Sequence, residues 1–182
     1  NTFVGTGFVL ANAGSQSADG YEFDLVISPT ENIDLAVSGL FIDPIYDSYV
    51  GAAPGDLSGT VPSNTPEDTI SSTITWNYNI SGWDSFLRIS HLYSSKAQLL
   101  ENPVHQALIE AQGNGYREQD TLNLTAGFEK DNLSITLWGK NINDDEFLTS
   151  AFIGVADLSE TTFFGYPNSF KSYGLTLSLI HI

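Results

Sequence analysis

Only a few residues in this sequence are of the types that carry out chemistry, and the first candidate is a serine–histidine pair. Ser90 and His91 could serve as nucleophile and general base in a hydrolase if an acidic residue oriented the imidazole. The two residues are consecutive in a stretch whose apolar and polar residues alternate as in a β-strand. Neighbouring side chains of a strand point to opposite faces, so the pair cannot meet. The sequence therefore predicts no catalytic residue.

Two clusters contain residue types that ligate metal ions. Glu101 and His105 have the spacing of neighbours on one helix face, and Glu110 follows in the segment Pro103–Gln112, which is predicted to be helical. The second cluster has the composition of a calcium-binding loop: Asn141, Asn143, Asp144 and Asp145. It lacks the glycine and the terminal glutamate of an EF-hand. We interpret the first cluster as a solvated loop and the second as turn residues, so no metal and no cofactor is predicted.

The composition excludes several classes of protein. Six Lys and Arg against 22 Asp and Glu give a net charge of -16, so no nucleic-acid partner is expected. The absence of Cys excludes disulfides, thiol nucleophiles and Cys-based metal sites. No apolar run approaches the ~20 residues of a spanning helix, so any membrane span would have to be a β-strand.

A period of two in hydrophobicity is the main structural signal. In Thr69–Ile80 one row of side chains is almost wholly apolar and aromatic, and the other consists of Ser, Thr and Asn. The sequence predicts an all-β fold, an antiparallel up-and-down meander of about eight long strands. The expected strands are Thr2–Ala11, Gly20–Ser28, Ile33–Ile42, Thr69–Ile80, Trp83–Lys96, Asp120–Lys130, Leu133–Asn141 and Phe170–Ile180.

The connections between these strands alternate in length. Three are tight and polar, at residues 28–32, 81–83 and 129–132, and three are long, at about 43–68, 97–119 and 142–169. A compact soluble domain seldom contains several long connections without structure. An outer-membrane barrel has short periplasmic turns and long extracellular loops, and its tilted strands need ~9–11 residues to cross the apolar band. Loop lengths and strand lengths therefore favour a membrane barrel.

The alternation alone does not decide which face is the interior. In a soluble β-sandwich the apolar rows would form a core, whereas in a membrane barrel they would contact lipid. Charges on the polar rows suit either a water-filled lumen or the outside of a sandwich. Because loop alternation favours the barrel, four charged residues are predicted to face the lumen: Glu22, Asp24, Arg88 and Glu129.

Aromatic residues gather next to one of the short turns. Trp76, Tyr78 and Trp83 flank the turn at residues 81–83, where the aromatic girdle of a barrel belongs, and ordinary core aromatics are the alternative. Trp138 departs from this pattern, because its parity with Ser134 and Thr136 turns it inward. It is expected to be a lumen residue or part of a bulge.

Four segments in order, residues 11–25, 61–78, 133–147 and 172–179, resemble the C-terminal part of the barrel of TonB-dependent outer-membrane receptors. The resemblance is carried by a hairpin of the form Asn-Ala-Gly, short loop, Gly-x-Glu, and by a late-strand pattern Asn-Leu-x-Asp-x-x-Tyr. The residues concerned are Asn12, Gly14, Gly20, Glu22, Asn141, Asp144 and Phe147. Phe147 stands where the family has Tyr. The resemblance implies one domain, residues 1–182, that forms an open C-terminal portion of a 22-stranded transmembrane barrel.

The resemblance also implies a function and partners. It implies a receptor in the bacterial outer membrane that takes up a scarce solute, such as an iron chelate, cobalamin or a saccharide, with energy from TonB. Its partners would be the lipid bilayer, lipopolysaccharide, the solute, and a plug domain and TonB reached through an N-terminal part upstream. A passive porin-like channel, a soluble β-sandwich binding module and an outer-membrane hydrolase remain alternatives.

Two features of the loops and the C-terminus complete the expectations. Acidic residues in the first and last long loops would attract cationic or chelated ligands or bind lipopolysaccharide through divalent ions, with solubility as the simpler interpretation. They are Asp43, Asp47, Asp56, Glu67, Asp68, Asp144, Asp145, Glu146, Asp157 and Glu160. Residues 177–182 equal the translation of a transposase mosaic-end sequence used in sequencing libraries. We expect at least residues 180–182 to be such an artefact.

Overall fold

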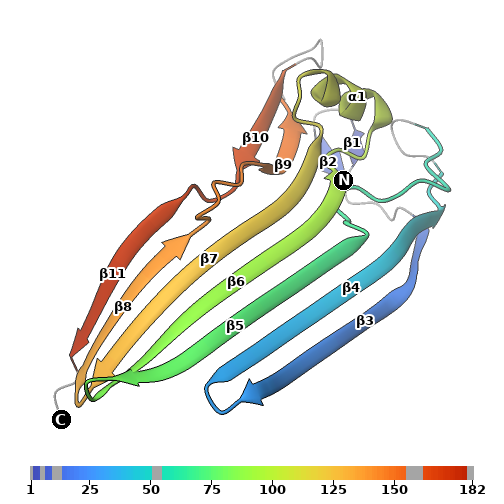
Figure 1. Cartoon of the computed structure of the whole chain (residues 1–182). Coiled ribbons are helices and arrows are strands. Elements are labelled where there is room, and N and C mark those ends of the chain that lie inside the picture. The colour runs from blue at the N-terminus through green and yellow to red at the C-terminus, as the bar shows by residue number, and fades with distance from the viewer. Residues whose placement is uncertain (1, 5–6, 10–13, 51–54, 155–161, 180–182) are drawn as a thin grey trace.

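The computed structural model describes residues 2–4, 7–9, 14–50, 55–154 and 162–179. Its main feature is a seven-stranded antiparallel sheet in the order β3-β4-β5-β6-β7-β8-β11 (Figure 1). The strands are β3 (Ser15–Thr30), β4 (Ile33–Ser48), β5 (Asp68–Ile80), β6 (Trp83–Gln98), β7 (Tyr116–Lys130), β8 (Leu133–Lys140) and β11 (Ser172–Leu179). Each strand of the sheet pairs with the next one in the chain, apart from the step over β9 and β10. This all-β meander confirms the predicted fold class.

Two short hairpins and one helix lie outside the sheet. β1 (Thr2–Val4) pairs with β2 (Gly7–Val9), and β9 (Leu148–Ile153) pairs with β10 (Phe163–Pro167). Helix α1 (Pro103–Ala111) begins after Asn102, whose side chain caps it by accepting from the Val104 and His105 N–H groups. No helix among the described residues is long and apolar enough to cross a membrane.

The two ends of the sheet are unlike each other. The short turns β3–β4, β5–β6 and β7–β8 share one end, whereas α1, β9, β10 and the long connections occupy the other (Figure 1). The β5–β6 turn places Ser81 at φ 54° and Gly82 at φ 78°, which is the left-handed geometry that two-residue hairpins favour. The predicted alternation of short and long connections is therefore confirmed.

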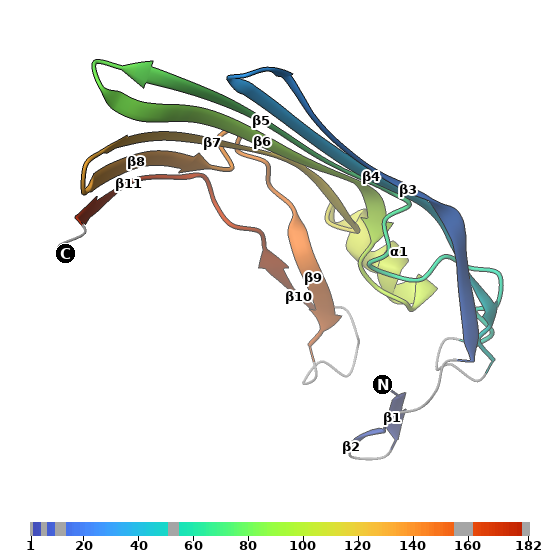
Figure 2. The same cartoon turned by 90° about the horizontal axis from the view of Figure 1, so that it is seen from below.

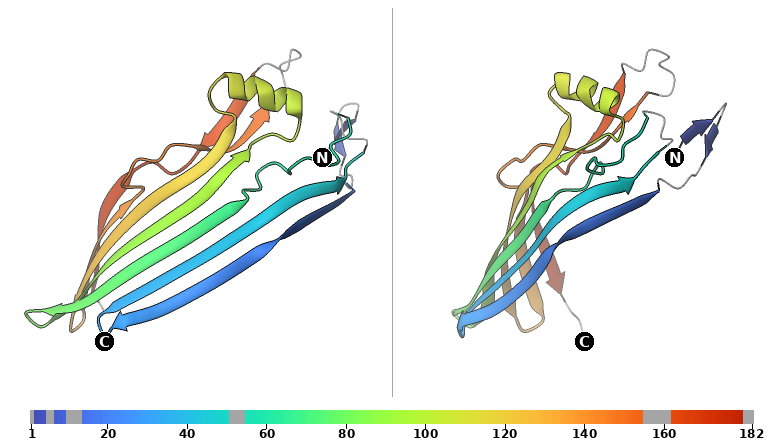
Figure 3. Two further views of the ribbon diagram at one scale, coloured as in Figure 1. Left: turned by 45° about the vertical axis from the view of Figure 1, so that its right-hand side comes forward. Right: turned by 90° about the vertical axis from the view of Figure 1, so that its right-hand side faces the viewer.

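The sheet is curved and open. α1 and the β9–β10 hairpin lie on its concave side (Figure 2), and its edge strands β3 and β11 lie apart with no partner on their outer sides in the part of the chain described (Figure 3). β3 and β4 have 16 residues each, more than the ~9–11 that cross an apolar band. The end of the sheet with the long connections would therefore project beyond a bilayer.

The register gives the sheet two unlike faces. One row crosses five strands as Ile27, Leu35, Ile74, Ile89 and Leu124. The next row, on the other face, is Val26, Ala36, Thr73, Ser90 and Asn123. One face is thus largely apolar, with Ser72 and His91 among its polar exceptions, and the other is mostly hydroxyl, amide and charged.

No second layer covers the apolar face in the described residues. The side chains of Ile74 and Leu124 are 39% and 37% exposed, and none of the large side chains described is fully buried. A β-sandwich would bury such a row between its two sheets. The few buried apolar side chains come from the end with the long connections: Tyr46, Leu57, Ala97, Leu99 and Ile109. The small core therefore lies among the loops, and the single-layer sheet argues against the sandwich alternative.

Glycines opposite aromatic residues explain the inward position of Trp138. Gly174 pairs directly with Trp138, and a Cβ on Gly174 would lie 2.1 Å from the indole ring. Gly127 leaves the same space for Phe86 on the neighbouring strands. Aromatic rings packed over cross-strand glycines protect the backbone in curved sheets. The register around Trp138 has no shift, so this residue is not part of a bulge.

Two details of the predicted strands were wrong. The first expected strand, Thr2–Ala11, is instead a separate short hairpin within its described residues, so the sheet has seven strands. The expected loop at 142–169 contains β9 and β10, because Leu148–Ile153 and Phe163–Pro167 pair with each other rather than with the sheet. The helix expected at Pro103–Gln112 is confirmed as α1.

Candidate functional site

The concave face of the sheet is the first candidate for a functional surface. A pocket is lined by Gln119, Thr121 and Asn123 of β7 together with Phe147 and with Thr149 of β9. Because β9 lies on the concave side (Figure 2), the polar row of β7 faces that side. The register carries this assignment across the sheet, so the hydroxyl and amide rows line the concave face and the apolar rows line the convex face.

The four residues predicted to face the lumen all lie on the concave face by register. Glu22 and Asp24 of β3 pair with Leu40 and Ser38 of β4. Arg88 pairs with Thr75 and Thr125, and Glu129 pairs with Asp84 and Ser134. The Arg88 Nε donates to Thr75 Oγ1 at 3.1 Å, and its guanidinium lies 5.3 Å from the Phe86 ring centroid. Their contact with a water-filled lumen stays a prediction.

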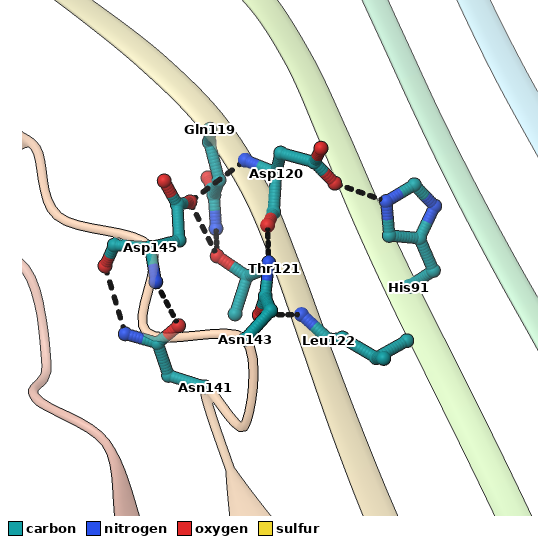
Figure 4. Close-up of polar contacts among 8 residues, drawn as sticks. All are labelled: His91, Gln119, Asp120, Thr121, Leu122, Asn141, Asn143 and Asp145. Atoms are coloured by element: carbon teal, nitrogen blue, oxygen red, sulfur yellow. Dashed lines mark hydrogen bonds and ion pairs between the residues drawn. The ribbon is translucent and has the colours of Figure 1, made fainter.

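The turn at residues 141–145 follows β8 and forms hydrogen bonds with the edge of β7 (Figure 4). The β8 ladder with β7 ends at Leu124; beyond it the Ile142 N–H donates to the Leu122 carbonyl at 2.8 Å, and side chains of the turn make the other bonds. Asn143 Oδ1 accepts from the Leu122 N–H at 2.9 Å, and its Nδ2 donates to the Asp120 carbonyl. Asp145 Oδ2 accepts from the Asp120 N–H at 2.7 Å. These bonds satisfy a strand edge that would otherwise be unpaired.

Asn141 holds this turn together. Its side chain is almost entirely buried, with the residue only 3% exposed, and it adopts φ 50°, which Asn tolerates better than most residues. Its Nδ2 donates to the carbonyls of Asp145 and Ser169 at 2.8 and 3.0 Å, and its Oδ1 accepts from the Asp145 N–H at 2.8 Å. Asn141 therefore joins the end of β8 to the segment that leads into β11.

The other residues of the family motif have simpler positions. Asp144 is at φ 62° in the same turn, and the Phe147 N–H donates to Asn168 Oδ1. Gly14 has φ 113°, and a Cβ added to it would lie 2.0 Å from the Ser48 carbonyl oxygen. A Cβ added to Gly20 would lie 2.0 Å from the Phe41 carbonyl oxygen. Asn12 lies outside the described residues. The motif is thus made of positions that shape turns and strand contacts.

The three aromatic residues predicted to form a girdle share the convex face near the short turns. Trp76 and Tyr78 of β5 have ring centroids 4.8 Å apart, and Trp83 pairs with Ile80 across the hairpin. Trp76 is 48% exposed. Their contact with a membrane interface stays a prediction.

The candidate catalytic pair is separated as the alternation requires. Ser90 Oγ accepts from Thr73 Oγ1 on the concave face, whereas His91 Nε2 lies 2.5 Å from Asp120 Oδ1 on the convex face (Figure 4). The His91 side chain is 39% exposed and that of Asp120 is 65% exposed, so solvent reaches this contact. Sequence reasoning missed the pair because its two residues come from different strands and meet diagonally.

The candidate metal ligands do not gather. Glu101 precedes α1, and its Oε2 accepts from the Ser63 N–H, while Glu110 accepts from the Gln106 side chain. Hydrogen bonds from Tyr116 and Gln106 lower the pKa of Glu110. Across the described ranges, no three His, Asp and Glu side chains come together in a way that could hold a metal ion. The calcium-like cluster uses its side chains for backbone hydrogen bonds instead.

The acidic residues of the loops contact different partners. Asp47 accepts from the Ser17 hydroxyl, and hydrogen bonds from Ser58 lower the pKa of Asp56. Tyr46 lies near the end of β4 with the long connections, beyond the expected bilayer. Burial and the nearby Glu101 carboxylate raise its pKa to about 12. Asp157 and Glu160 lie outside the described residues. An attraction for cationic ligands stays a prediction.

The chain has the fold of a segment of the β-barrel wall of a TonB-dependent receptor, as the sequence resemblance implied. The crystal structure of the ferric yersiniabactin uptake receptor FyuA from Yersinia pestis matches 94% of this chain with a TM-score of 0.73 and 14% sequence identity. The match covers 24% of FyuA, so this chain spans about a quarter of that receptor. No protein-family model and no curated protein matches the sequence.

Proposed function

We propose that this chain is part of the barrel wall of a bacterial outer-membrane receptor that takes up a scarce solute with energy from TonB. The observation that carries the proposal is a single curved sheet with an uncovered apolar face, a polar concave face and all its long connections at one end. This is the arrangement of a transmembrane β-barrel. The likeness to FyuA supports a receptor rather than an enzyme.

In this proposal each part of the chain has a place. The convex rows, with Trp76, Tyr78 and Trp83 at the periplasmic border, contact lipid, and the concave rows contact water. α1 and the β9–β10 hairpin lie on the extracellular side, where they meet the solute and lipopolysaccharide. The plug domain and the segment that contacts TonB belong to an N-terminal part of the receptor. The solute is an iron chelate, cobalamin or a saccharide.

Uptake measurements test this proposal directly. The gene that encodes the chain, with its genomic flanks, is expressed in an outer-membrane host, and uptake of labelled ferric chelates, cobalamin and maltodextrins is measured with and without TonB. The proposal expects one solute to be taken up only when TonB is present. Uptake that continues equally without TonB would contradict energised transport and favour a passive porin-like channel.

A further inference from the structure

The loop between α1 and β7 contains the one Asn-Gly dipeptide of the sequence, Asn114–Gly115. An asparagine can lose ammonia spontaneously when the peptide nitrogen of the next residue attacks its side-chain carbonyl carbon. Glycine favours this attack, because it has no Cβ to hinder the approach. Each of the other asparagines precedes a residue that has a side chain. Asn114 is therefore the asparagine of this sequence that is most prone to the reaction.

The Asn114 side chain is exposed and weakly held. Its Nδ2 lies 3.4 Å from the Gln112 carbonyl oxygen, which is a long hydrogen bond, and its Oδ1 accepts no bond among the residues described. It also lines a pocket of about 200 Å³ between the α1–β7 loop and the base of the β9–β10 hairpin. The carboxamide therefore has room to turn towards the following peptide nitrogen.

The Gly115 peptide group is held in a way that leaves its N–H available. Its carbonyl oxygen accepts from the Leu99 N–H at 3.3 Å and from Gln106 Nε2. Its N–H donates to no acceptor in the part of the chain that the structure describes. Gly115 is buried, but ring closure needs no solvent there, because the attacking nitrogen and the attacked carbon belong to adjacent residues.

A carboxylate side chain packs against this glycine. A Cβ added to Gly115 would lie 2.1 Å from Glu110 Cγ, so the two residues are in direct contact. Glu110 Oε1 accepts from Gln106 Nε2 at 2.9 Å, and the same amide group donates to the Gly115 carbonyl. Hydrogen bonds from Tyr116 and Gln106 lower the pKa of Glu110, so the carboxylate is ionised at neutral pH and can accept a proton.

We propose that Asn114 is a site of spontaneous deamidation, in which the Gly115 nitrogen attacks Asn114 Cγ while Glu110 accepts the Gly115 proton. The new C–N bond closes a succinimide ring and the bond from Cγ to Nδ2 breaks. Glu110 returns the proton to the leaving nitrogen, which departs as ammonia. Water then opens the ring at one of its two carbonyl carbons and gives aspartate, or isoaspartate when the main chain continues through the former side-chain carbon.

Either product changes the contacts between the long connections. A carboxylate at position 114 would share its pocket with Glu146, and like charges in one pocket repel each other. Isoaspartate also adds one carbon to the main chain directly before Gly115, whose carbonyl holds Leu99 and Gln106. Leu99 is part of the small core among the loops, so deamidation should loosen the packing of α1 on this core.

Peptide mapping by mass spectrometry on the purified receptor tests the proposal. The receptor is incubated at neutral pH, and the exchange of amide for carboxylate at each asparagine is followed with time. Asn32 is the internal control, because it is also exposed but precedes the branched Ile33. Deamidation at Asn114 is expected to be at least about tenfold faster than at Asn32, and an isoaspartate methyltransferase should label the product. Equal rates at the two positions would overturn the proposal.

Variants of Glu110 test its role as the proton acceptor. Glu110→Gln keeps an acceptor for Gln106 and should slow the deamidation roughly tenfold or more, because the general base is lost. Glu118→Gln removes the same charge from an exposed position on β7 and should leave the rate within about twofold. If Glu110→Gln folds poorly, Glu110→Asp replaces it, which withdraws the carboxylate and should also slow the reaction. An unchanged rate in the folded Glu110 variant would overturn the proposal.

Variants of Asn114 test the structural consequence. Asn114→Asp copies one product, and Asn114→Gln has a longer side chain that closes such a ring much more slowly. Hydrogen exchange of residues 97–115 should become faster as the native receptor deamidates and be faster from the start in Asn114→Asp, but stay constant in Asn114→Gln. Exchange that is unchanged after deamidation would overturn the loosening. These outcomes are independent of the proposed uptake function, because neither the reaction nor its measurement involves a solute or TonB.

Discussion

Replacement of Asn141 by Ala should release the turn that joins β8 to β11. The change removes three hydrogen bonds and leaves the Asp145 N–H and the Ser169 carbonyl without these partners, whereas the Asp145 carbonyl keeps its bond from Asn168. Ser169 is exposed and Asp145 is only half-buried, so the loss of these two partners costs roughly 1 kcal/mol. An Ala at φ 50° adds about 1 kcal/mol. The total expected loss of local stability is about 2 kcal/mol.

Hydrogen exchange measured by mass spectrometry on the purified receptor would detect this loss. A loss of about 2 kcal/mol corresponds to roughly 30-fold faster exchange of the amides in and around residues 141–147, where opening is local. Asn141→Gly keeps the backbone conformation and should give a smaller increase. Asn32→Ala is the control, since Asn32 is an exposed amide in a short turn. Exchange in the Asn141→Ala variant within threefold of the native rate would refute the reasoning.

Two further changes have defined outcomes. Gly174→Ala places a Cβ 2.1 Å from the Trp138 ring, so the barrel should lose roughly 1–3 kcal/mol of stability. The temperature at which the folded band disappears in gel electrophoresis should fall, and equal loss in a Trp138→Ala background would argue against this contact. Because the pKa of Tyr46 is raised to about 12, the neutral phenol stabilises the folded loops fully below the unfolded pKa near 10, and this contribution should disappear as the pH rises towards 12. Protease resistance of residues 43–68 should therefore fall over that range, and an identical fall in Tyr46→Phe would exclude Tyr46 as the cause.

The sequence predicted the sheet well because most residues of its strands alternate in polarity. Ile74 and Thr73 differ in polarity and lie on opposite faces, and this difference repeats on the neighbouring strands. The β9–β10 hairpin was missed because its strands are short and pair only with each other. The first expected strand was wrong because Thr2–Val4 and Gly7–Val9 pair with each other instead of forming one strand of the sheet.

The candidate site was harder to predict, because its contacts join residues distant in sequence. The acidic and amide residues around Asn141 were recognised as turn residues, but their bonds to Asp120 and Leu122 depend on where β8 ends. The pocket on the concave face combines Gln119 and Thr121 of β7 with Thr149 of a hairpin that was not expected. Parity did place Trp138 inward, and only the structure reveals Gly174 beneath its ring.

The central claim is that the apolar rows contact lipid and the polar rows do not. The chain has no Cys, so a spin label can be attached at single introduced cysteines along β5, from Ile70 to Asn77, in the receptor reconstituted into bilayers. Oxygen concentrates in lipid and the polar relaxation agent NiEDDA stays in water, so collision rates report the environment of each label. The account predicts high oxygen accessibility at the even-numbered positions, including Ile74, and low oxygen accessibility at the odd-numbered ones, including Thr73. Alternation of the opposite phase, or equal accessibility at both sets, would contradict the account.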